Sequence, residues 1–192
     1  MRLTAATLTV LVLLVGCAPE EPPSPQDQFW AALEALCGQA FGGTVAEAPA
    51  GDTTFANRAL VMHVRDCQEG EIRIPFHVGE DRSRTWVISR IETGLRLKHD
   101  HRHADGSEDA VTQYGGDTGD SGLAGKQEFR ADSLTAALIP AAVTNVWTIE
   151  VEPGNRLVYA LRREGTDRRF RVEFNLTTPI PAPPPPWGAT AP

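Results

Sequence analysis

Apolar side chains recur at every second position through most of the chain, and this periodicity restricts the fold more than any other feature. Side chains of an extended strand alternate between two faces, so a strand with this pattern has one apolar and one polar face. Turn sequences such as DCQEG, EPGN and REGTD separate the runs at hairpin spacing. The apolar positions are Leu60, Met62 and Val64; Ile72, Ile74, Phe76 and Val78; Trp86 and Ile88; Leu95 and Leu97; Trp147, Ile149 and Val151; Leu157, Tyr159 and Leu161; and Phe170, Val172, Phe174 and Leu176. The pattern predicts sequential antiparallel strands.

One short helix is predicted ahead of these strands. Ser24 and Pro25 suit the N-cap and the first helical position, Phe29 and Leu33 follow at helical spacing, and Gly38 ends the segment. A closed sheet would remove exposed strand edges. We therefore predict a mainly β protein, a single antiparallel up-and-down β-barrel with one short N-terminal helix, with a β-sandwich as the alternative.

The order of helix, glycine and meander resembles the plan of the lipocalin and other calycin barrels. The Gly-x-Trp motif that starts the first strand of that family is absent, although Phe41-Gly42-Gly43 occupies the corresponding region. Between the histidine-containing run and Trp147, the glycine-rich stretch from Tyr114 to Gly122 predicts a flexible loop. After it, Asp132 would cap a second short helix that ends near Pro140.

The first 16 residues have the composition of an export signal. Arg2 supplies a positive charge, and the mostly apolar run from Leu8 to Val15 is too short to span a bilayer. The residues at its end, Leu14-Val15-Gly16-Cys17, resemble the lipobox of bacterial lipoproteins. The resemblance implies cleavage before Cys17, attachment of acyl chains such as palmitate to this residue, and anchoring in a membrane. Ala18 after the cysteine implies the outer membrane of the cell envelope, facing the periplasm.

Proline-rich segments flank the predicted barrel. The predicted divisions are a lipoprotein signal peptide at 1–16, a proline-rich tether at 17–26, a barrel domain at 27–178 and a proline-rich tail at 179–192. Pro183 to Pro186 predict a polyproline II run. We expect the tail to lie along the barrel wall with Trp187 packed, and a docking peptide for an envelope partner is the alternative.

The charge of the mature chain argues against nucleic acid as a partner. Loss of Arg2 changes the formal charge from -7 to -8, whereas phosphate binding needs a basic stripe. Arginines gather near the C-terminus, but they are interleaved with Glu164, Asp167 and Glu173, which predicts a solvated face and not a binding patch. These arginines are Arg162, Arg163, Arg168, Arg169 and Arg171.

Two cysteines follow the lipobox cysteine, Cys37 and Cys67. In an exported protein an even pair predicts a disulfide. It would close a loop of about 30 residues and contribute about 3 kcal/mol to the free energy of unfolding. Metal ligation by the pair is disfavoured, since neither cysteine has a second cysteine or a histidine at close ligand spacing.

Three of the five histidines occupy alternate positions directly after Leu97. His99, His101 and His103 therefore share a strand face with this leucine, and the apolar row becomes a histidine row without changing sides. The imidazoles should begin where the core ends. We predict a ligand or metal site there, near a barrel mouth, together with Tyr114.

Several chemistries fit this row. Alternate residues lie about 7 Å apart, so a divalent metal would take one His-x-His pair and a third ligand from elsewhere. The candidates for that ligand are His63, His77, Glu108 and Asp109. An acid–base enzyme would pair one imidazole with a carboxylate of the segment from Asp105 to Asp109. The same hydrogen bonds would equally suit a solvated hairpin end with no ligand.

Two arginines beside a tryptophan form a further candidate group. Arg82 and Arg84 flank Ser83 close to Trp86, and guanidinium groups bind carboxylates and phosphates well. They are candidate contacts for an anionic small molecule. The alternative is that they pair with the carboxylates of the preceding turn, Glu80 and Asp81.

These patterns predict a membrane-anchored envelope lipoprotein that binds a small ligand or metal ion at a histidine-rich barrel mouth. One alternative is a periplasmic metal-dependent or acid–base hydrolase that uses the same residues. Another is a structural envelope protein that acts through its tail. The segments SRTW, LKHDHRHADGSED and YGG also resemble an uncharacterised group of exported bacterial proteins, a resemblance that implies no activity.

Overall fold

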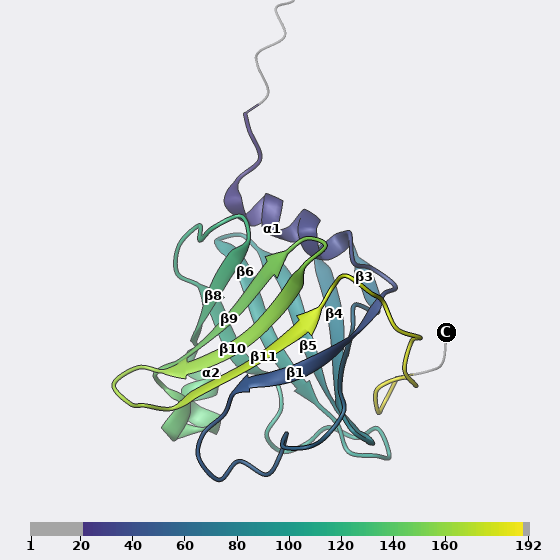
Figure 1. Ribbon diagram of the computed structural model, residues 1–192. Helices are drawn as coiled ribbons and strands as arrows, with labels where there is room; N and C mark the ends of the chain where they lie inside the picture. The colour runs from purple at the N-terminus through teal and green to yellow at the C-terminus, as the bar shows by residue number, and fades with distance from the viewer. Residues whose placement is uncertain (1–20, 190–192) are drawn as a thin grey trace, which may run out of the picture.

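The computed structural model describes residues 21–189, which form a closed antiparallel β-barrel with a helix across one end (Figure 1). The predicted barrel is confirmed, and the β-sandwich alternative is wrong, because β2 pairs with β4 and closes the sheet. The strands within the described residues are β1 (Ala40–Glu47), β2 (Leu60–His63), β3 (Asp66–Gln68), β4 (Glu71–Val78), β5 (Asp81–Ile91), β6 (Gly94–His101), β7 (Tyr114–Thr118), β8 (Lys126–Ala131), β9 (Asn145–Glu152), β10 (Arg156–Arg163) and β11 (Arg169–Asn175).

Neighbours along the chain are mostly neighbours in the sheet. Strands β4 to β11 follow one another in sequence order, β11 pairs with β1, and β1 pairs with β2. The short strand β3 pairs with β4 and lies outside the closed ring. Closure leaves the ring strands without free edges, as expected for a stable antiparallel sheet.

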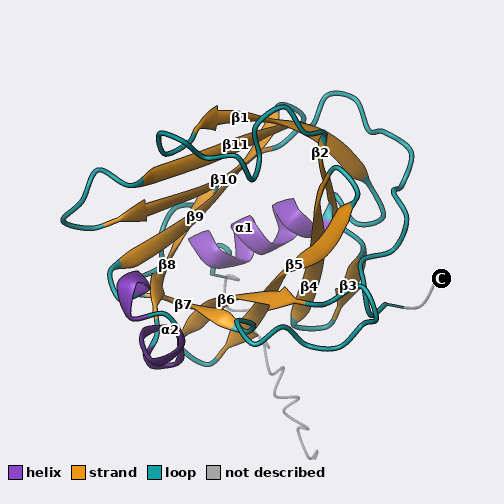
Figure 2. Ribbon diagram, turned by 90° about the horizontal axis from the view of Figure 1, so that it is seen from below, coloured by secondary structure: helices purple, strands orange, loops and turns teal. Residues whose placement is uncertain are grey.

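Helix α1 (Pro25–Glu34) covers one end of the barrel. The predicted N-terminus is confirmed: the Ser24 hydroxyl accepts a hydrogen bond from the Asp27 backbone, and the Asp27 carboxylate bonds back to Ser24. Phe29 and Leu33 are fully buried. Figure 2, which looks into the barrel from the opposite end, shows α1 lying across the far opening.

Polar contacts fix α1 to the turns at its end of the barrel. Gln26 Nε2 donates to the carbonyl of Asp120 at 3.0 Å, in the turn after β7. The Arg90 guanidinium pairs with Asp27 at 2.7 Å and lies 4.8 Å from the ring centre of Trp30. These contacts hold α1 across this end of the barrel, which the helix closes.

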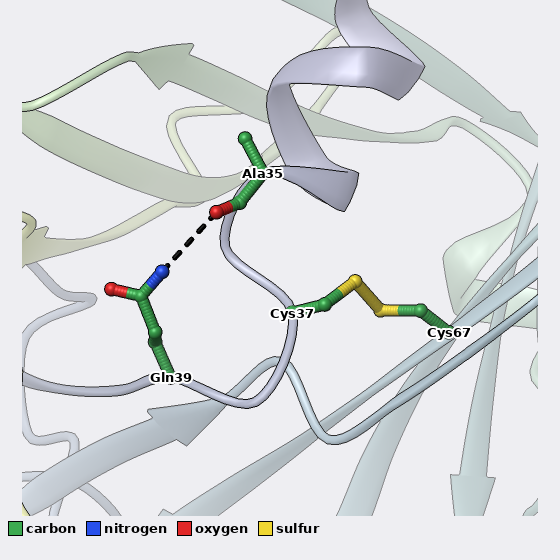
Figure 3. Close-up of a disulfide and its surroundings, with 4 residues drawn as sticks. All are labelled: Ala35, Cys37, Gln39 and Cys67. Carbon is green, nitrogen blue, oxygen red and sulfur yellow. Dashed lines mark hydrogen bonds between the residues drawn. A yellow bond between two sulfur atoms is a disulfide. The ribbon is translucent and has the colours of Figure 1, made fainter.

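A disulfide between Cys37 and Cys67, the pair expected from the sequence, connects the segment after α1 to β3 (Figure 3). The Cα atoms are 6.3 Å apart, within the usual range. Beside it, Gln39 Nε2 donates to the Ala35 carbonyl at 3.2 Å. The crosslink and this hydrogen bond hold the end of α1 next to the sheet.

The first part of the glycine-rich segment from Tyr114 to Gly122 is not the loop that the sequence predicts, whereas residues 119–122 lie in the turn after it. Tyr114–Thr118 is strand β7, paired with β6 and β8. Gly116 approaches its neighbour so closely that an added Cβ would lie 1.6 Å from the Arg130 carbonyl oxygen. The second predicted helix is present as α2 (Ser133–Leu138), capped by Asp132 and followed by a 3₁₀ turn at Pro140–Ala142.

The C-terminal tail lies along the outer wall, as expected. Ile180 forms a bridge with Ala40 of β1. Arg82 Nη1 donates to the Pro185 carbonyl at 3.0 Å, and the Trp187 backbone N–H donates to the Arg82 carbonyl at 3.1 Å. Among the described residues, none of the helices is long and apolar enough to cross a membrane.

Candidate ligand-binding site

A cavity of about 490 Å³ occupies the barrel at the end opposite α1. Its walls come from strands β4 to β7 and β9 to β11, and its rim comes from the loop after β1 and the connection before β9. The lining residues are Pro49, Ala50, Gly51, Asp52, Thr54, Phe55, Phe76, Arg84, Trp86, His99, His101, Tyr114, Ile139, Ala142, Asn145, Trp147, Tyr159, Leu161, Arg163, Arg168 and Phe170.

Aromatic rings form most of the inner wall. Trp86 stacks on Tyr159 with ring centres 4.3 Å apart, and on its other side Phe76 lies 4.8 Å away. The ring of Phe55, from the loop after β1, packs against Phe170 with ring centres 4.5 Å apart. Packed rings of this kind give a rigid, apolar surface on which another ring can stack.

The phase of β6 places the first two histidines of the row at the cavity. Leu97 is fully buried and His99 is 3% exposed, both on the inner face, and His101 also lines the cavity. His103 does not join them. Strand β6 ends at His101, and His103 is exposed in the turn that its backbone forms with Ser107.

Hydrogen bonds hold His99 as a neutral ring. Its Nδ1 lies 3.1 Å from the Tyr114 carbonyl, which can only accept, so Nδ1 carries the proton. Nε2 is then an acceptor, and the Tyr159 hydroxyl donates a hydrogen bond to it at 2.7 Å. Burial lowers the pKa of His99 to about 3 and holds the pKa of Tyr159 well above 10.

A second pair lies beside the first. The Tyr114 hydroxyl and His101 Nε2 are 3.1 Å apart, and the Tyr114 ring stacks on His99 with centres at 4.5 Å. Burial lowers the pKa of His101 and raises the pKa of Tyr114 to about 12. Within the described residues His101 Nδ1 has no hydrogen-bond partner, so it can bond to a ligand.

The contacts of His99 disfavour a metal ion. Both of its ring nitrogens are already bonded to tyrosine groups. His77, a proposed third ligand, lies on the outer face of β4, because Phe76 and Val78 point inward. In the described part of the chain no group of three histidine, cysteine or acidic side chains could hold a metal.

The carboxylates after β6 do not pair with the imidazoles. Asp105 accepts from Ser107, Glu108 pairs with Arg102, and Asp109 accepts from the backbone of Val111. The predicted hydrogen bonds between carboxylates and imidazoles are therefore not formed at His99 and His101, which bond to tyrosine groups instead.

The two arginines near Trp86 have different roles. Arg84 lines the cavity, where it pairs with Asp81 at 2.5 Å and lies 5.8 Å from the ring centre of Phe55. Arg82 points away from the cavity and holds the tail through Pro185. Of these two arginines, only Arg84 lines the cavity, and its charge is already balanced by Asp81.

Sequence reasoning missed Arg163 and Arg168, which line the mouth of the cavity. The predicted solvated face holds for Arg168, which is exposed, but both arginines also lie at the cavity, which the prediction did not include. The alternation of side chains could have identified them. Leu161 and Phe170 face inward, Arg163 comes two positions after Leu161, and Arg168 comes two positions before Phe170.

Compared with protein-family models, with curated proteins and with solved structures, the chain matches none of them. Membership of an exported protein group therefore stays a prediction. Cys17 lies outside the described residues, so its lipidation also stays a prediction.

Proposed function

We propose that this protein is a lipid-anchored binding protein of the cell envelope that holds a small, ring-containing, largely apolar molecule in its barrel. The observation that carries this proposal is the cavity of about 490 Å³ lined with packed aromatic rings. Sites for small molecules are mostly apolar hollows of about 300 to 1,000 Å³ with a few fixed polar groups.

The polar groups inside the cavity support an uncharged inner portion of the ligand. His99 and Tyr159 satisfy one another and stay neutral, because burial disfavours their charged forms. A charged group placed among them would lose its hydration without gaining a counter-charge. His101 Nδ1 offers one uncharged hydrogen-bonding contact.

The anchor proposal depends on the sequence from Leu14 to Cys17. The disulfide between Cys37 and Cys67 supports it, since such bonds persist in oxidising compartments outside the cytosol. The chain enters the barrel domain at α1, at the end opposite the cavity mouth. A lipid on Cys17 would therefore leave the mouth facing away from the membrane.

The uncharged fluorophore N-phenyl-1-naphthylamine tests the binding proposal on the purified protein. Trp86 and Trp147 line the cavity, so a bound naphthalene ring should quench tryptophan emission and gain emission itself, saturating near one probe per chain. In Leu161→Trp the larger side chain fills the cavity, and we expect the affinity to fall at least about tenfold, by overlap with the ligand.

Leu123→Trp is the matched control, because Leu123 is 66% exposed in the turn between β7 and β8 at the α1 end. It should bind the probe like the unmodified protein. Equal binding by both variants, or no saturable binding by the unmodified protein, would refute the proposal.

A further inference from the structure

We propose, building on the ligand-binding function above, that the ligand is a ring compound with one anionic group, which lies between Arg163 and Arg168 at the mouth. Its rings would enter the aromatic part of the cavity. The chemical class is an aromatic or polycyclic carboxylate, sulfonate or phosphate ester.

The two arginines face each other across a hairpin. They flank the turn between β10 and β11, and the Arg163 backbone N–H donates to the Arg168 carbonyl at 3.2 Å. Both line the cavity. Like charges directly opposite one another on a hairpin are destabilising. Two like charges therefore occupy opposed positions at the mouth, where a bound anion would offset them.

Nothing in the described residues neutralises this pair. Arg163 donates to the uncharged amide of Asn145 at 2.9 Å, and the Arg168 guanidinium has no hydrogen bond or ion pair. Neither carboxylate of the turn pairs with these arginines: Glu164 pairs with Arg130 and Arg162, and Asp167 forms no ion pair within the described residues.

The outer face of the same hairpin carries the other two arginines. Arg162 makes two hydrogen bonds to Glu128, at 2.9 and 2.7 Å, and is neutralised by it. Arg169 bonds only to the uncharged carbonyls of Thr166 and Arg168. Unlike this outer pair, Arg163 and Arg168 line the cavity, where the anionic group of a ligand would supply the missing charge.

Other charged groups lie around the opening, and none of their carboxylates pairs with Arg163 or Arg168 within the described residues. Arg84 is balanced by Asp81, and one oxygen of Asp52 accepts the backbone N–H of Thr54. Asp109 lies near enough to Tyr114 to affect its pKa. A cationic pair at the opening of a chain with a net charge of -7 would direct small anions to this opening.

A matched pair of probes tests the inference. 1-Anilinonaphthalene-8-sulfonate has the rings of N-phenyl-1-naphthylamine and adds one sulfonate. At low ionic strength we expect Arg163→Gln/Arg168→Gln to bind the sulfonate probe at least about tenfold more weakly, because two charge-assisted hydrogen bonds are lost. Its affinity for the uncharged probe should change less than about twofold.

The control removes the same charge from the same hairpin. Arg162→Gln/Arg169→Gln should bind both probes like the unmodified protein. If both double variants weaken the sulfonate probe equally, or if neither does, the anion site is refuted while uncharged probe binding still supports the cavity. If the uncharged probe fails to bind the unmodified protein, the proposed function itself is refuted.

Discussion

At the scale of single residues, His99 shows how burial decides what an ionisable side chain can do. It is 3% exposed and bonded to a carbonyl and to a hydroxyl, so its charged form is disfavoured. The sequence places this imidazole on the inner face through the alternation of β6, and that phase is confirmed by the burial of Leu97. It does not identify Tyr159, which is 60 residues away in sequence. The hydrogen bonds and the pKa follow from that distant contact.

Acidification should therefore destabilise the fold through His99. The unfolded pKa is about 6.5 and the folded pKa about 3, so between these values the unfolded state binds more protons. The stabilisation is complete above pH 6.5 and is lost as the pH falls towards 3. Between its two pKa values, each such histidine changes the free energy of unfolding by up to about 1.4 kcal/mol per pH unit.

Urea unfolding at pH 7.0, 6.0 and 5.0 measures this slope, and His99→Gln should make it shallower. His77, whose pKa burial lowers to about 4, supplies a slope of the same sign in both proteins. His103→Gln, at an exposed position, is the control and should keep the original slope. An unchanged slope in His99→Gln would contradict the neutral, buried imidazole.

At the scale of elements, β7 shows why a strand can be missed. Its sequence, YGGDT, has two glycines that normally indicate a turn or loop. Pairing with β6 and β8 makes this segment a strand. Its glycines are needed because both neighbours approach β7 more closely than a side chain would allow. An added Cβ would lie 1.9 Å from the Leu97 carbonyl oxygen at Gly115, where φ is +154°, and 1.6 Å from that of Arg130 at Gly116.

Gly116→Ala should lower the free energy of unfolding by about 1–3 kcal/mol, since the new methyl group forces β7 away from β8. Gly42→Ala in β1 is the matched control, because nothing lies within 4 Å of the Cβ built there. That change should be neutral or stabilise by up to about 1 kcal/mol. Chemical denaturation measures both, and equal stabilities of the two variants would contradict the close approach.

At the scale of the whole molecule, the barrel has two unlike ends. The α1 end is closed by Phe29 and Leu33, and the described chain begins there, at residue 21. The other end holds the cavity and the rim arginines. The described part of the proline-rich tail, up to residue 189, lies along the outer wall, and none of these residues lines the cavity. The proposed anchoring and binding would thus occur at opposite ends of the barrel.

Mass spectrometry of the protein purified from the membranes of a diderm bacterial host tests the anchor. We expect the mature chain to begin at Cys17 and to carry the added mass of acyl chains. Each buried methylene contributes about 0.8 kcal/mol to membrane binding, so several chains hold the protein firmly. Cys17→Ser should lose this mass, whereas Cys37→Ser/Cys67→Ser should keep it. A mature chain that begins elsewhere and carries no acyl groups would refute the lipoprotein prediction.

The sequence by itself determined the strand phases, the capped helix and the barrel class, because these follow from local alternation and local capping chemistry. It also placed His99 and His101 at the boundary between core and opening. Only the tertiary structure decided that β7 is a strand, that His103 lies outside the site and that Arg82 holds the tail. It alone also shows which arginines of the β10–β11 hairpin lack an acidic partner, because that depends on side chains brought together by closure of the sheet.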